Sequence, residues 1–204
     1  MSAVRPAEPN AAAYLAASAA IDCDHPAVAR KAAELKAEAA DACGLVRASF
    51  AFVRDQIRHS WDFRQGPVTC KASDVLTHGT GYCYAKSHLL AALLRANGIP
   101  AGLCYQRLSL SGHGAPFCLH GLNAVLLPAF GWYRLDPRGN KPGVAAAFCP
   151  PKEALAFSAS APGEFDLPEI WAEPLPVVVR ALESAPDVEA LYASLPDFAA
   201  NGLT

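Results

Sequence analysis

Apolar positions recur at helical spacing through residues 11–58, where alanine-rich runs carry charged residues between them. Pro26 suits the first turn of a helix, because the N–H that proline lacks would be unpaired there anyway. The apolar positions that follow it at helical spacing are Val28, Ala32, Leu35 and Ala39. Gly44 is expected to end this helix. A second helix is expected after it, with an inward face of Leu45, Phe52, Val53 and Ile57.

The helical pattern breaks at "HSWDFRQGPVTC", residues 59–70, which predicts a loop. One short helical turn is expected in "KASDVLTHG", where His78-Gly79 can terminate it. A longer helix is predicted from about Tyr82 to Ala96. Lys86 and Arg95 are expected to point away from the apolar stripe of this helix, which consists of Ala85, Leu89, Ala92/Leu93 and Ala96.

Three segments rich in β-formers follow, "AGLCYQRLSL", "FCLHGLNAVLL" and "WYRLD", and the turns between them predict an antiparallel meander. Asp136-Pro137 closes the third strand, because proline cannot donate to the sheet. Beyond it, a short strand at 154–158 and a helix in "PDVEALYASL" are expected, the latter begun by Pro186 and Asp187. Helices together with an antiparallel sheet indicate an α+β protein.

Composition restricts the functional classes. The chain has 204 residues, of which 52% are hydrophobic, and a formal net charge of −2, so it can bury a core and has no basic surface suited to nucleic acid. No apolar run reaches the ~20 residues of a membrane helix, and "AAAYLAASAA" lacks the composition of a signal segment. We therefore expect a cytoplasmic protein whose seven cysteines are mostly reduced thiols. The sequence does not indicate an oligomeric state.

Three residues stand in an order that suits nucleophilic catalysis: Cys83 at a helix start, His120 on a strand, and Asp136 at the end of the next strand. A free thiol with a pKa of about 8.5 is mostly protonated at neutral pH, and both a helix N-terminus and a neighbouring imidazolium favour the thiolate. A carboxylate beyond the imidazole fixes its tautomer and orientation. Strand parity and a four-residue connection allow His120 to meet Asp136 across the antiparallel pair.

The combination of Gly81 and Cys83 at a helix start, the helix exit "LLRANGIPA", His120 on a strand, and "WYRLDP" resembles the transglutaminase-like superfamily of papain-type cysteine enzymes. The match covers roughly residues 45–140. It implies a cysteine helix packed on an antiparallel sheet, and acyl transfer or hydrolysis on a peptide, protein or small amide through a thioester, without a metal or another cofactor. It also implies that Cys83 is the nucleophile, His120 the general acid and base, and Asp136 the residue that orients His120. One departure is Leu122, at a position where many members carry tryptophan.

The resemblance leaves the ends of the chain uncovered, and we expect them to shape the substrate cleft. The domain boundaries predicted on this basis are a helical extension at 1–44, the catalytic core at 45–165, and a C-terminal segment at 166–204 that packs on the core. Hydrolysis is favoured over transfer to an amine, because no amine-acceptor site is visible. The Cys83 backbone N–H would be one oxyanion donor. The further candidates for oxyanion or substrate contacts are Trp61, Gln56, His113 and Tyr82.

Two other functions stay open at this point. The chain could be a catalytically silent transglutaminase-like module used for binding. It could also be a zinc-binding domain with ligands drawn from Cys104, His113, Cys118 and His120, although the local spacing of most zinc sites is missing. Among the remaining histidines, His88 is expected to face away from Cys83, and His59 and His78 are interpreted as capping or surface residues.

Overall fold

The computed structural model describes residues 4–197. The helices of this part are η1 (Ala11–Tyr14), α1 (Pro26–Ala37), α2 (Ala42–Gln56), α3 (Ser60–Phe63), α4 (Ala72–His78), α5 (Cys83–Ala96), α6 (Pro176–Ser184) and α7 (Val188–Ala193). The strands are β1 (Arg5–Pro6), β2 (Arg58–His59), β3 (Thr80–Gly81), β4 (Ala101–Ser109), β5 (Phe117–Leu127), β6 (Gly131–Leu135), β7 (Ala147–Cys149), β8 (Lys152–Ala154), β9 (Phe165–Asp166) and β10 (Glu169–Ile170). The predicted α+β class is confirmed.

The structure corrects the expectation that Gly44 ends the first helix, because α1 ends at Ala37 and α2 begins at Ala42. The Asp41 carboxylate accepts a hydrogen bond from the Gly44 N–H at 2.7 Å, which caps the start of α2. Gly44 therefore lies in the first turn of α2. Asp at an N-cap satisfies an otherwise unpaired helix donor, and this local bond decides the boundary.

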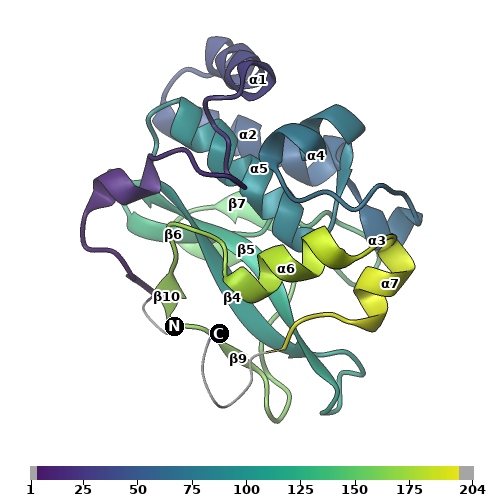
Figure 1. The fold of residues 1–204 in the computed structure, drawn as a ribbon. Coiled ribbons are helices and arrows are strands. Elements are labelled where there is room, and N and C mark those ends of the chain that lie inside the picture. Colours follow the sequence, from purple (N-terminus) through teal and green to yellow (C-terminus); the bar gives the residue numbers. More distant parts are fainter. Residues whose placement is uncertain (1–3, 198–204) are drawn as a thin grey trace.

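Helix α5 is central to the fold (Figure 1), with α1, α2 and α4 packed against it on one side and β4 and β5 on the other. Residues Cys83 to Arg95 are all buried, so α5 has no polar face towards solvent, and the prediction of an amphipathic helix is wrong in this respect. Lys86 and Arg95 do not reach solvent. Both are buried, and their charged groups donate to backbone carbonyls of neighbouring segments. A helix covered on every side must pair its polar side chains internally.

The main sheet has the strand order β6-β5-β4-β9 and confirms the predicted antiparallel meander. Its register sets His120 opposite Gln106 and Asn123 opposite Leu135. Asp136 follows β6 directly, so it leaves the sheet on the same face as His120. The fourth strand, β9, is formed by Phe165–Asp166 and was not predicted.

The C-terminal third wraps around this core. The strand expected at 154–158 overlaps β8 only at Ala154, because β7 and β8 form a hairpin of their own. Helix α7 is confirmed, with the Asp187 carboxylate capping it through the Ala190 N–H at 2.8 Å, whereas α6 was not predicted. Farther on, the carbonyl of Pro196 accepts a bond from the Leu119 N–H at 2.7 Å, next to His120 on β5.

Candidate active site

Cys83 is the first residue of α5, and the short strand β3 ends two residues before it. Gly81 pairs with His59 in the short parallel ladder of β2 and β3. A Cβ at Gly81 would lie 3.3 Å from both Ala85 Cβ and Thr69 Oγ1, so glycine allows the chain to enter the helix here. Tyr82 is the N-cap and makes no side-chain capping bond. The first N–H groups of α5 therefore lack a cap, which favours negative charge at this end of the helix.

A second glycine lets the start of α5 reach the sheet. A Cβ at Gly121 would lie 2.9 Å from Tyr84 Cδ1 and 3.2 Å from its Cα, so no larger residue fits without a shift. In this close packing the Gly121 N–H donates to the Cys83 Sγ, with N and S 3.5 Å apart. Gly121 follows His120 directly, and the contact therefore fixes the thiol beside that histidine.

The ring of His120 lies next to Asp136. His120 Nε2 is 2.7 Å from Asp136 Oδ2, and both side chains are buried. Asp136 also accepts from the backbone N–H groups of Arg138 and Ala156, each at 3.1 Å. Phe157 packs edge-on against the imidazole, with ring centroids 5.0 Å apart at 89°. The carboxylate is thus held in place by the main chain, and it holds His120 in turn.

The positive charge of His120 and the negative charge of Asp136 stabilise each other. Burial would lower the pKa of His120, but the negative charges of Asp136 and Cys83 outweigh it and raise that pKa. Burial would likewise raise the pKa of Asp136, yet the charge of His120 and the hydrogen bonds to Asp136 lower it. These two directions favour a charged imidazolium–carboxylate pair beside the thiol over a broad range around neutral pH.

A pocket of about 410 Å³ opens beside Cys83. Two of the candidates for oxyanion or substrate contacts, Trp61 and Tyr82, line it. Gln56 is exposed at the end of α2 and His113 is exposed in the loop before β5, and neither is among the described residues of the lining. The full lining is His59, Trp61, Tyr82, Cys83, Leu108, Ser109, Leu110, Gly112, Cys118, Leu119, His120, Arg138, Lys141, Phe157, Ser158, Glu164 and Tyr192.

His59 corrects the sequence interpretation. It was interpreted as a capping or surface residue, yet its side chain is buried and lines the pocket. His59 occupies the N-cap position of α3, but its side chain makes no capping hydrogen bond. Burial and the neighbouring Arg138 hold the pKa of His59 well below its usual range, so the ring is neutral at neutral pH. Arg58 and His59 are both polar, so the sequence has no apolar alternation here that could have indicated a short strand or a buried histidine.

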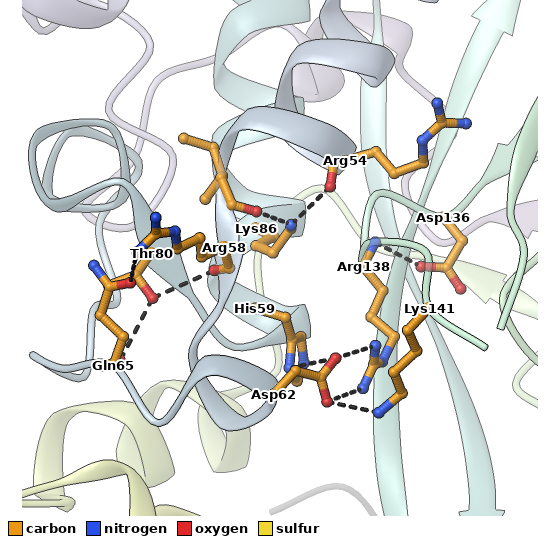
Figure 2. A network of polar contacts seen from close by, with 11 residues as sticks. Arg54, Arg58, His59, Asp62, Gln65, Thr80, Lys86, Asp136, Arg138 and Lys141 are labelled. Atoms are coloured by element: carbon orange, nitrogen blue, oxygen red, sulfur yellow. Dashed lines mark hydrogen bonds and ion pairs between the residues drawn. The ribbon is translucent and has the colours of Figure 1, made fainter. Parts of the chain in front are cut away.

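Sequence reasoning also missed a polar network behind this histidine. Figure 2 shows that the Asp62 carboxylate faces Arg138 and Lys141 on one side and His59 on the other. The two guanidinium nitrogens of Arg138 lie 2.7 and 3.0 Å from its oxygens, and Lys141 Nζ lies at 2.6 Å. Burial would raise the pKa of Asp62, but the bonds from these two cations lower it to about 2. Arg138 and Lys141 lie in an irregular segment whose sequence has no periodic pattern of apolar residues, so the sequence did not indicate that they reach this site.

The other predicted residues lie elsewhere. His88 points to the far side of α5, where its Nδ1 is 2.8 Å from the Cys70 carbonyl oxygen, as expected for a residue that faces away from Cys83. Cys104 packs with Tyr14 and Leu122 in a separate buried cluster. Within residues 4–197, no three His, Cys, Asp or Glu side chains are grouped so that they could hold a metal ion. All seven cysteines are free thiols.

Comparison with known proteins gives the class. The family model of the transglutaminase-like superfamily matches residues 29–137, more than half of the chain, so the chain belongs to this superfamily. A search of the curated proteins finds no match. Across residues 4–197, no helix combines the length and the apolar character needed to cross a membrane.

Two solved structures match part of this chain. A candidate cysteine protease from Cytophaga hutchinsonii superposes with a TM-score of 0.53 at 18% identity, over 64% of this chain and 43% of its own. The periplasmic domain of TgpA from Pseudomonas aeruginosa, bound to ethylmercury, gives a TM-score of 0.45 at 23% identity, over 61% of this chain and 46% of its own. This chain thus matches less than half the length of either. At these identities the first likeness shows the fold alone.

Proposed function

We propose that the protein is a cysteine hydrolase that cleaves an amide or ester bond through a thioester on Cys83. The observation that carries this proposal is the arrangement around His120. Its Nε2 lies 2.7 Å from Asp136 Oδ2, and its backbone neighbour Gly121 donates to the Cys83 Sγ. Cys83 at the start of α5, His120 on β5 and Asp136 directly after β6 thus lie close together, and Cys83 and His120 line the pocket. This arrangement supports the roles of nucleophile, base and orienting carboxylate.

The reaction follows from these positions. The Cys83 thiolate attacks the carbonyl carbon, a C–S bond forms, and the carbonyl electron pair moves to oxygen. In this proposal the backbone N–H of Cys83, at the uncapped start of α5, stabilises that oxyanion. Trp61 and Tyr82 line the same pocket. His120 gives its proton to the leaving group as the C–N or C–O bond breaks. Water then attacks the thioester, His120 accepts the water proton, and the C–S bond breaks to release the acid and Cys83.

Alkylation by iodoacetamide at pH 6 tests the proposal without a known substrate. We expect Cys83 to react faster than Cys149, although Cys149 is exposed and Cys83 is buried, because only Cys83 has an imidazolium beside it. Intact mass and peptide mapping give both rates in one sample. Cys118 is a matched control within the same pocket: burial raises the pKa of its thiol to about 12, so it should stay unlabelled.

Two variants complete the test. Cys83→Ala should keep only the slow reaction at Cys149, and His120→Gln should slow labelling of Cys83 at pH 6 by roughly tenfold or more. Labelling of Cys149 at pH 6 that equals or exceeds labelling of Cys83 would show that Cys83 is an ordinary buried thiol. The proposed function would then be wrong.

A further inference from the structure

One wall of the pocket carries more positive than negative charge. Arg138 and Lys141 both line the pocket, and both bind the carboxylate of Asp62. Asp62 itself is not among the described residues of this lining and borders a separate hollow of about 160 Å³. Two cations therefore face the pocket while the single carboxylate that they share lies behind them. We call Arg138 and Lys141 the cationic wall.

Apart from Asp62, no acidic side chain among the described residues forms an ion pair with the cationic wall. His59 is uncharged at neutral pH and adds no negative group. Among the described residues that line the pocket, Glu164 is the only acidic one. Its carboxylate accepts three backbone N–H groups, from Ser109, Ser160 and Ala161, each at 2.9 Å. These hydrogen bonds lower the pKa of Glu164, so its carboxylate stays charged, but among the described residues no ion pair joins it to Arg138 or Lys141. The two cations of the cationic wall therefore share the single carboxylate of Asp62, which leaves Lys141 able to bind a second carboxylate.

The cationic wall is fixed relative to the reacting thiol. The Arg138 N–H donates to Asp136 Oδ1, while the other oxygen of Asp136 contacts His120. Figure 2 shows Arg138 reaching from Asp136 to Asp62, so one residue joins the orienting carboxylate to the cationic wall. Lys141 is the outer member, with 42% of its side chain exposed, and its ammonium has N–H groups beyond the one directed at Asp62.

We propose that the pocket selects amide substrates that carry a carboxylate, which binds to Lys141 and Arg138 while the scissile carbonyl lies at Cys83. The aromatic rings of Trp61, Phe157 and Tyr192 in the same lining would contact the apolar part of such a substrate. Arg138 and Lys141 already share the carboxylate of Asp62, and a substrate carboxylate would be their second negative partner. This inference rests on the proposed function of Cys83 and names the substrate class of the same site.

A matched pair of covalent probes tests the inference. N-bromoacetyl-isoglutamine has a side-chain carboxylate, and N-bromoacetyl-glutaminamide has a neutral amide of the same shape. With either probe the Cys83 thiolate displaces bromide, so a C–S bond forms as the C–Br bond breaks. The ratio of the two second-order rates at Cys83 measures the charge preference of the pocket, independently of how reactive the thiol itself is.

The ratio is compared between wild type, Lys141→Gln, Lys141→Glu and the control Lys36→Gln, an exposed lysine at the end of α1. The His120 imidazolium attracts the anionic probe in every variant, so the comparison between variants carries the result. We expect Lys141→Gln to lower the ratio by about threefold to tenfold, and Lys141→Glu to lower it further. Lys36→Gln should leave it unchanged. High salt should reduce the wild-type ratio.

The two proposals fail in different ways. An equal ratio in wild type and both Lys141 variants, with Cys83 still labelled selectively, would overturn the carboxylate preference and leave the proposed function standing. A lack of selective labelling at Cys83 by either probe would overturn both.

Discussion

At the residue scale, Asp136 is the most informative side chain of the site. It is fully buried, and its two oxygens contact His120 and two backbone N–H groups. A buried carboxylate is stable only when it is paired and hydrogen-bonded in this way. Asparagine would keep the shape of the side chain but replace one accepting oxygen with an amide NH2 group. The hydrogen bond that orients His120 and the negative charge that stabilises its imidazolium would both be lost.

The Asp136→Asn variant is expected to alter the pH profile of Cys83 alkylation. The raised pKa of His120 depends on Asp136, so in the variant the imidazolium is lost at a lower pH and less thiolate forms. The iodoacetamide rate at Cys83 should fall by roughly tenfold or more at pH 6. The difference should shrink at alkaline pH, where wild type loses its imidazolium as well. Asp55→Asn, on the exposed end of α2, is the control. Superimposable profiles would contradict the role of Asp136.

At the element scale, the buried Lys86 of α5 and the half-buried Asn97 directly after it fix the position of neighbouring helices. Lys86, one turn after Cys83, donates to the carbonyls of Ile57 and Arg54 at the end of α2. Asn97 donates to the Ala32 carbonyl of α1 at 2.9 Å. The bonds from Lys86 pair carbonyls that the end of α2 leaves free. Together with the bond from Asn97 to α1, they hold α5 in one orientation.

Lys86 should also make stability depend on pH. Burial lowers its pKa to about 7, whereas in the unfolded chain it is about 10.4. Between these values the unfolded chain binds the proton and the folded chain does not, so this residue makes the free energy of unfolding rise with pH. Lys86→Met removes the effect. Relative to wild type, the variant should lose stability from pH 7 to 10, by at most about 1.4 kcal/mol per pH unit.

Urea unfolding at several pH values measures this difference. Subtracting wild type removes the opposite contribution of His120, whose raised pKa makes stability fall as pH rises through the same range. Lys36→Met, on the exposed face of α1, is the matched control and should give a difference that does not change with pH. A constant difference for Lys86→Met as well would mean that Lys86 stays charged in the folded protein.

At the scale of the whole molecule, the C-terminal part completes the site that the N-terminal part begins. Helix α7 lies beside α3 (Figure 1), and Tyr192 stacks on Trp61 with ring centroids 3.6 Å apart and planes 5° apart. Phe157, Glu164 and Tyr192 all lie outside the part that matches the family model, yet they line the pocket. Within residues 4–197, the Pro196 carbonyl binds the Leu119 N–H beside the site, and Pro196 is not part of the pocket lining.

Removing the Tyr192 ring should change which reagents reach Cys83. In Tyr192→Ala the stacked pair is lost, and the rate for a bulky maleimide such as fluorescein maleimide should rise severalfold relative to N-ethylmaleimide. Tyr192→Phe keeps the ring and should keep the ratio near that of wild type. The two rates are measured at Cys83 by peptide mapping. If both variants gave the wild-type ratio, Tyr192 would not limit access to the pocket.

Local patterns predicted the elements that carry the site. Helical spacing and Asn97-Gly98 predicted α5 and its end, and β-rich segments separated by turns predicted β4, β5 and β6. Strand parity also placed His120 and Asp136 on one face, where the two side chains do meet. These predictions succeeded because each depends on residues close in sequence, for which periodicity and turn chemistry determine the structure.

The remaining features depend on contacts between distant segments. The burial of Lys86, the position of His59 against the pocket, and the pairing of Asp62 with Arg138 all arise when elements far apart in the chain pack together. The sequence by itself determined the class of fold and the order of cysteine, histidine and aspartate. Only the tertiary structure decided the charge and shape of the pocket, because its walls come from irregular segments whose positions are set by packing and by hydrogen bonds to the core.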